Sequence, residues 1–96
     1  MTNGSAVGAI AVSKAGRDAG RIFIIVGVLD DGTVSVCDGR LRKVVKPKKK
    51  NLRHLGVIDA DRTDVRRLIA DGGLTDAKIR EILAKYRIDP EKSAKE

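Results

Sequence analysis

The stretch RIFIIVGVLDDGTVSVC, residues 21–37, decides the fold of this chain. Its first part, residues 21–29, is almost continuously apolar and rich in β-branched side chains, which predicts a central strand buried on both faces. Asp31-Gly32 is a strong hairpin signal, because a type I′ turn needs positive φ angles that glycine adopts freely. Residues 33–37 then alternate in polarity as a second strand would, and we expect Cys37 on its outward face or at its end.

Three further segments extend the predicted sheet. Residues 7–12 are apolar and small, residues 40–45 follow a second Asp-Gly turn, and residues 55–59 close the series. Pro47 should end the fourth strand or lie at its edge, because proline cannot donate to the ladder. The segment 48–54 is predicted as loop with at most one helical turn. Five short strands joined by tight turns predict a small closed β-barrel, whose closure removes exposed sheet edges.

The period of the apolar residues changes after residue 60. Thr63 is predicted to cap a first helix that ends at Gly72, Thr75 to cap a second helix, and Pro90 to end it. The apolar residues of the second helix follow the spacing i, i+3, i+4 and i+7, which is typical of a helix with one buried face. They are Ile79, Ile82, Leu83 and Tyr86.

The expected organisation has three parts. Residues 6–60 form the β-domain, residues 61–88 form a helical appendage, and residues 89–96, which end in PEKSAKE, form a disordered tail.

The composition argues against several classes of function. Cys37 has no partner for a disulfide, and with His54 it makes only two soft ligands, whereas zinc takes about four. The longest apolar run is far shorter than the about 20 residues that span a membrane. No basic region precedes the N-terminal apolar patch, so we expect no signal peptide and a cytoplasmic location. No triad, paired-carboxylate site or metal cluster can be assembled, so we expect no enzyme activity, no cofactor and no metal.

The net charge of +7 and the pI of about 9.9 favour an anionic partner, most often nucleic acid. Residues 40–54, RLRKVVKPKKKNLRH, hold eight Lys or Arg and no acid, whereas residues 61–96 are nearly neutral. A lysine-rich stretch can be a solvated loop, or an edge strand that resists aggregation. The alternative is that a polyanion neutralises these charges, because binding a phosphate backbone would release its counterions.

The segment SKAGRDAGR, residues 13–21, contains two Gly-Arg pairs. It does not match a phosphate-binding P-loop or a dinucleotide fingerprint, because a strand and not a helix follows it. Gly16 and Gly20 can instead serve a positive φ or a close backbone approach in a tight connection. The arginines are a separate question, because an exposed guanidinium can bind phosphate with two parallel donors.

The run VGAIAVSKAGRDAGRIFIIVGVLDDGTVSVCDG, residues 7–39, resembles a KOW motif: a strand, a loop with a glycine before a basic residue, and an apolar second strand. This motif occurs in NusG-type transcription elongation factors and in several large-subunit ribosomal proteins. With the basic segment LRKVVKPKKKNLRHL, the chain is similar to bacterial KOW-domain RNA-binding proteins, which are themselves similar to the ribosomal proteins called L-fourteen-e, L-six-e and L-twenty-seven-e.

The resemblance covers about residues 6–60 and implies an SH3-like five-stranded barrel that binds RNA, usually ribosomal RNA. Gly20 matches the signature glycine of the motif, and Arg21 matches the basic residue after it. The helical end lies outside the motif, so the resemblance implies nothing about it.

The residues predicted to bind RNA come from the glycine-containing loop and the basic run. They are Lys14, Arg17, Gly20, Arg21, Arg40, Arg42, Lys43, Lys46, Lys48, Lys49, Lys50, Arg53 and His54. The two aromatic residues, Phe23 and Tyr86, fit an apolar core better than a base-stacking platform, so binding should depend on RNA backbone and shape.

We therefore expect a non-enzymatic RNA-binding protein that acts on structured or ribosomal RNA in a ribonucleoprotein of translation. The alternative is a protein-docking adapter of the ribosome or the transcription machinery, with the C-terminal helices offering a groove or an apolar face. DNA binding is a third interpretation, which the lack of a helix that is basic on one face disfavours.

Overall fold

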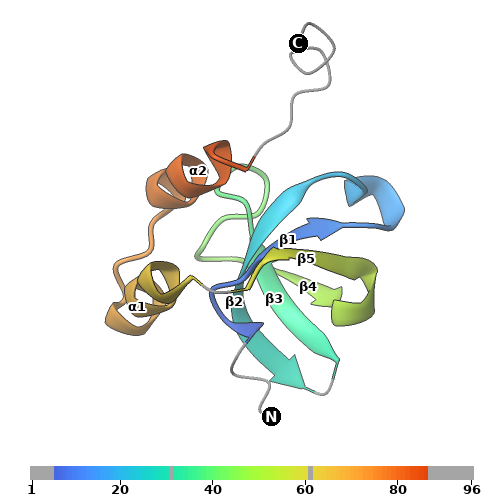
Figure 1. Cartoon of the computed structure of the whole chain (residues 1–96), viewed down its shortest axis with the longest axis horizontal. Helices are drawn as coiled ribbons and strands as arrows, with labels where there is room; N and C mark the ends of the chain where they lie inside the picture. Colours follow the sequence, from blue (N-terminus) through green and yellow to red (C-terminus); the bar gives the residue numbers. More distant parts are fainter. Residues whose placement is uncertain (1–5, 31, 61, 87–96) are drawn as a thin grey trace, which may run out of the picture.

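The computed structural model describes residues 6–30, 32–60 and 62–86, and its elements form one antiparallel sheet followed by two helices (Figure 1). The strands are β1 (Ile10–Ser13), β2 (Ile22–Asp30), β3 (Thr33–Cys37), β4 (Lys48–Asn51) and β5 (Leu55–Asp59). One-turn 3-10 helices, η2 (Gly16–Asp18) and η3 (Leu52–His54), connect strands, and the helices α1 (Thr63–Asp71) and α2 (Asp76–Ala84) follow. The predicted fold class, mainly β with a helical C-terminus, is confirmed.

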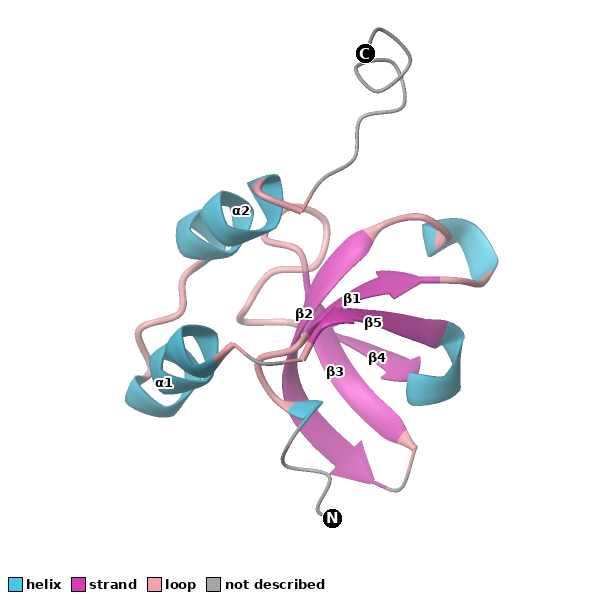
Figure 2. Cartoon of the chain, in the orientation of Figure 1, coloured by secondary structure: helices cyan, strands magenta, loops and turns pink. Residues whose placement is uncertain are grey.

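The strands are hydrogen-bonded in the order β4-β3-β2-β1-β5, so β4 and β5 are the two edges (Figure 2). In the described part of the chain β4 and β5 do not pair, so the predicted closed barrel is not confirmed. The β2–β3 hairpin forms as predicted, with Asp30 opposite Thr33 and a φ of +85° at Gly32. The turn type that was predicted also depends on Asp31, which lies outside the described residues.

The central strand β2 is buried on both faces, as its continuous apolar run predicts. Ile24 faces a cluster that the two helices complete, and Phe23 and Ile25 face a second cluster formed within the sheet. All three side chains are fully buried. Because strand side chains alternate between faces, β2 contributes to both clusters at once. The buried residues of the second cluster are Ala9, Ala11, Phe23, Ile25, Val34, Val36 and Leu55.

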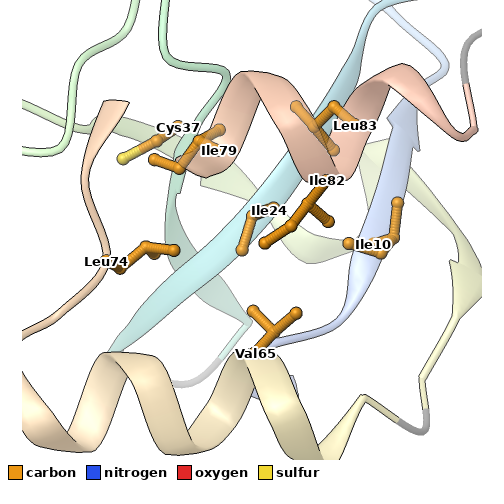
Figure 3. Close-up of a cluster of buried hydrophobic side chains, with 8 residues drawn as sticks. All are labelled: Ile10, Ile24, Cys37, Val65, Leu74, Ile79, Ile82 and Leu83. Carbon is orange, nitrogen blue, oxygen red and sulfur yellow. The ribbon is translucent and has the colours of Figure 1, made fainter. Parts of the chain in front are cut away.

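Both helices pack their apolar residues against the sheet (Figure 3). The buried residues of this cluster are Ile10, Ile24, Cys37, Val65, Leu74, Ile79, Ile82 and Leu83. The apolar face predicted for the second helix is therefore confirmed. Cys37 is the last residue of β3, so the predicted position at the strand end is confirmed. The alternative, an outward exposed position, is wrong, because Cys37 is fully buried against Ile79 on the face that α2 covers. Because sheet and helices share this core, the domain boundary at residues 60/61 stays a prediction.

The predicted fourth strand, residues 40–45, is wrong. Residues 38–47 form a loop, and the fourth strand is Lys48–Asn51, which the sequence indicated as loop. Lysine has a low strand propensity, but β4 is an edge strand that pairs with β3 alone, and charged side chains are common there. The single helical turn predicted after it is confirmed as η3.

The helix ends show which signals in the sequence were reliable. Thr75 caps α2, because its Oγ1 accepts a hydrogen bond from the backbone N–H of Lys78 at 3.1 Å. Gly72 ends α1 with a φ of +73°. Thr63 is the first residue of α1 and not its cap, since Arg62 holds that position without a side-chain hydrogen bond. The predicted stop at Pro90 and the predicted tail over 89–96 lie outside the described residues.

Candidate nucleic-acid interface

The loop between β1 and β2 closes on itself through the backbone. The N–H of Ser13 donates to the carbonyl of Arg21, and the N–H of Gly20 donates to the carbonyl of Ser13, both at 2.8 Å. Gly16 and Gly20 have φ angles of +75° and +90°, and no atom lies within 4 Å of a Cβ placed at either residue. Their conformational role is therefore confirmed as positive φ and not close approach. The loop presents the exposed side chains of Lys14, Arg17 and Arg21.

The 3-10 turn η3 lies at the same end of the sheet as this loop (Figure 2). The N–H of Lys14 donates to the carbonyl of His54 at 2.8 Å, which joins the two segments directly. Arg53 is exposed and His54 is half-buried. Four of the predicted RNA-binding side chains, those of Lys14, Arg17, Arg53 and His54, therefore belong to segments gathered at this end.

The three lysines of β4 do not point the same way. Lys48 and Lys50 lie opposite Val36 and Val34 of β3, on the face of the second cluster, and both are half-buried. Lys49 lies opposite Ser35 and is exposed. Long lysine side chains can cover apolar surface with their methylene groups while the ammonium stays in water. β4 therefore presents positive charge on both of its faces.

The loop over residues 38–47 carries four predicted RNA-binding residues, all exposed: Arg40, Arg42, Lys43 and Lys46. Its turn is organised by the buried carboxylate of Asp38, whose Oδ1 accepts the backbone N–H groups of Arg40 and Arg42, each at 2.9 Å. The other carboxylate oxygen lies 3.8 Å from the guanidinium of Arg21, which brings the start of β2 close to this loop. Both carboxylate oxygens of Asp38 therefore have partners, and residues 39–58 contain no Asp or Glu.

Helix α2 holds the far side of the same loop. The carboxylate of Asp76 accepts the N–H of Val44 at 2.7 Å, and the guanidinium of Arg80 donates to the carbonyl of Gly39 at 2.6 Å. A Cβ on Gly39 would meet the backbone oxygen of Asp76 at 2.6 Å, so the approach of loop and helix requires a glycine here. Gly39 also has a φ of +78°.

The thirteen predicted residues therefore fall into groups. One group lies at the end that carries η2 and η3, one lies on the loop over 38–47, and the lysines of β4 follow that loop along the chain. Sequence reasoning missed the residues that hold the loop, namely Asp38, Asp76 and Arg80. Asp38-Gly39 was recognised only as a turn, and the helix contacts span 32 and 41 residues of sequence, beyond any local signal.

A separate polar cluster joins the end of β5 to both helices. The hydroxyl of Tyr86 donates to Asp59 at 2.7 Å and accepts a hydrogen bond from Arg62, whose guanidinium also binds both carboxylate oxygens of Asp64. The hydrogen bond from Arg62 holds the pKa of Asp64 down at about 2, and burial raises the pKa of Tyr86. This cluster fastens the helices to the sheet.

The described residues contain a single thiol, that of Cys37. Burial, and then the carboxylates of Asp76 and Asp38, raise the pKa of Cys37 to about 11, so its thiol stays protonated at neutral pH. In residues 6–30, 32–60 and 62–86 no group of three or more His, Cys, Asp or Glu is placed to hold a metal ion. A search of the same ranges finds no helix whose length and apolar character would allow it to cross a membrane.

No protein-family model matches the chain. It is 36% identical over 87 residues to the large ribosomal subunit protein eL14 of Desulfurococcus amylolyticus, covering 82% of this chain and 91% of that protein. It is 33% identical over 78 residues to eL14 of Staphylothermus marinus, covering 73% and 81% of the two chains. With eL14 of Aeropyrum pernix the identity is 30% over 92 residues, covering 88% and 91%.

Proposed function

Because the chain belongs to the eL14 family of large ribosomal subunit proteins, we propose that it is a non-enzymatic RNA-binding protein that contacts ribosomal RNA of the large subunit. The proposed contact surface combines the β1–β2 loop, the loop over residues 38–47 and strand β4. The expected location is the cytoplasm, where the ribosome works.

The observation that carries this proposal is the concentration of cationic side chains in one segment of the chain that holds a single acid. The loop over residues 38–47 and strand β4 hold seven of the predicted residues, and the only acid of this segment, Asp38, accepts two backbone N–H groups of its own turn and lies 3.8 Å from Arg21. Clustered cations repel one another unless a polyanion approaches, and binding a phosphate backbone gains free energy from released counterions. The arginines can add directed contacts, since a guanidinium binds phosphate with two parallel donors.

We further propose that residues 6–60 are the RNA-binding part, with an SH3-like arrangement of strands. The order β4-β3-β2-β1-β5 supports this proposal, since β2 lies at the centre and the last strand returns beside the first. The helices of 61–88 then serve as a supporting extension.

A protein-docking adapter remains the second candidate, and exposed apolar side chains on β5 favour it. Val57 and Ile58 are 51% and 47% exposed on this edge strand. The helices offer less exposed apolar surface to a protein partner, because the apolar residues of α1 and α2 pack in the core they share with the sheet.

Filter binding tests the proposed function. The purified protein is titrated with large-subunit ribosomal RNA and with a random RNA pool at several salt concentrations. If about five phosphates are contacted, log K should fall against log salt with a slope of roughly −3.5 to −4.5. Arg42→Gln should weaken binding, whereas the matched control Lys85→Gln, exposed at the end of α2, should not.

Absence of RNA binding at low salt, together with capture of a ribosomal protein at high salt, would refute the RNA function and support the adapter. Equal losses for Arg42→Gln and Lys85→Gln would show that net charge, and not this surface, determines binding.

A further inference from the structure

The loop over residues 38–47 is fixed in place from one side. Its first turn is held by Asp38, and its two ends are held by Arg80 and Asp76 of α2 through Gly39 and Val44. Val44 also packs against the cluster that the helices share with the sheet. Figure 1 shows the loop, drawn in green, beside α2. Such a loop presents a formed surface before any partner arrives, which reduces the conformational entropy that binding must overcome.

The outer side of this fixed loop carries two apolar side chains between its cations. Leu41 is 67% exposed and Val45 is 86% exposed, while Val44, between them in the sequence, packs inward against the cluster under the helices. Isolated exposed apolar residues are common on protein surfaces. Here, however, the anchors on Gly39 and Val44 fix the backbone of a short segment in which these two side chains and those of Arg40, Arg42, Lys43 and Lys46 are all exposed.

A partner that fits this surface must offer negative charge and apolar faces at the same place. An RNA duplex offers phosphates and ribose hydroxyls, but its base faces are hidden in the stack. Unpaired nucleotides in a loop or bulge offer phosphates and open base faces within a few ångströms, and arginine planes can stack on such bases. The charge of the loop favours RNA over a protein partner, because residues 39–47 contain four cations and no acid.

We propose that the surface formed by residues 40–46 binds unpaired nucleotides of RNA, with Leu41 and Val45 packing against bases while the cations bind phosphates, and with Arg80 as a positioning residue. This inference rests on the proposed function and adds to it the kind of RNA that is bound.

The test compares two RNA probes with equal numbers of phosphates, a hairpin with a large unpaired loop and a fully paired duplex. The double variant Leu41→Ser, Val45→Ser should lose about tenfold in affinity for the hairpin, the equivalent of packing about one apolar side chain, and less than about twofold for the duplex. Its salt slope should stay unchanged, since no charge is removed. The control is Leu29→Ser, which removes a 52% exposed leucine near the β2–β3 turn and should affect neither probe.

A second pair of variants tests the support by α2. Arg80→Gln should lower the preference for the hairpin about threefold or more, and Arg80→Lys should recover part of it, because the lysine keeps a donor for the carbonyl of Gly39. Lys85→Gln removes the same charge from α2 without touching the loop and should leave the preference unchanged. Melting curves by circular dichroism verify that every variant is folded.

If the Leu41→Ser, Val45→Ser variant loses equal affinity for both probes, or loses none for the hairpin, the inference is overturned while the proposed function stays intact. If the unmodified protein binds neither probe at low salt, the inference and the proposed RNA-binding function fail together. If the double variant keeps its hairpin affinity but loses binding to a purified large-subunit protein, the surface is a protein contact and the RNA assignment is wrong.

Discussion

Replacing Gly39 by alanine should destabilise the protein more than replacing Gly20, although both glycines have positive φ. Gly20→Ala meets nothing within 4 Å, so its cost is the backbone conformation alone, about 1–2 kcal/mol. Gly39→Ala adds a Cβ that would lie 2.6 Å from the backbone oxygen of Asp76 and 3.0 Å from Cγ of Arg80. Backbone cannot yield as a side-chain end can, so the loop and α2 must separate.

The extra cost of Gly39→Ala should be about 1–3 kcal/mol, the usual range for overpacking, which brings its total to about 2–5 kcal/mol. A domain of this size has about 5–15 kcal/mol of stability, so the difference is large enough to measure. The reduced entropy of the unfolded chain is the same for both variants and cancels in the comparison. Gly20→Ala is therefore the matched control.

Urea unfolding followed by circular dichroism measures the free energy of unfolding of both variants. Equal values for Gly39→Ala and Gly20→Ala would refute the close packing of the loop on α2. A larger loss for Gly20→Ala would refute the reasoning altogether.

Three further predictions concern the helices, the basic strand and the buried thiol. Thr75→Ala removes a formed cap and should cost about 1 kcal/mol in urea unfolding, whereas Thr63→Ala removes no cap bond and should cost distinctly less. Replacing Lys48, Lys49 and Lys50 by Gln should flatten the slope of log K against log salt by up to about 2–3 units in filter binding, and an unchanged slope would exclude β4 from the RNA contact. The folded protein holds the proton of Cys37 up to a pKa of about 11, against 9.0 for an ordinary thiol, so stability is full below pH 9 and declines as the pH rises toward 11. Urea unfolding at several pH values measures the free energy of unfolding of the unmodified protein and of Cys37→Ala. The unmodified protein should lose about 2 kcal/mol more than Cys37→Ala over this pH range, and parallel pH profiles of the two proteins would contradict this prediction.

Local sequence patterns predicted the elements in which the spacing of apolar residues matches their burial. β3 and β5 have the predicted bounds, and β2 and the apolar face of α2 follow their apolar periods closely. The first strand begins later than predicted, at Ile10. In each case the alternation or the helical spacing of the side chains matches the burial that the structure provides.

The loop over residues 38–47 could not be predicted in the same way. Val44 and Val45, shortly before Pro47, look like the end of a strand. The loop is instead held by Asp38 within its own turn and by Asp76 and Arg80, far along the chain. β4 forms from residues of low strand propensity because β3 offers an edge with Val34 and Val36 already in place. Tertiary contacts therefore override local preference at both positions.

The candidate interface was predictable as a set of residues but not as an arrangement. Charge and the lack of acid identified the basic segments, because these are properties of composition. The neighbourhood of Lys14 and His54, the ion pair of Arg21 with Asp38 and the opposite faces of Lys48 and Lys49 depend on the fold. That these side chains bind RNA stays a prediction.

The burial of β2 on both faces has a consequence for how the protein opens. Ile24 belongs to the cluster under the helices, while Phe23 and Ile25 belong to the cluster within the sheet, so neither cluster can lose this strand without disturbing the other. We expect the two clusters to unfold in one cooperative transition, with no state in which the sheet has melted beneath intact helices. The amide protons of residues 23–25 should then be among the slowest in the chain to exchange with deuterium, at the rate of global unfolding.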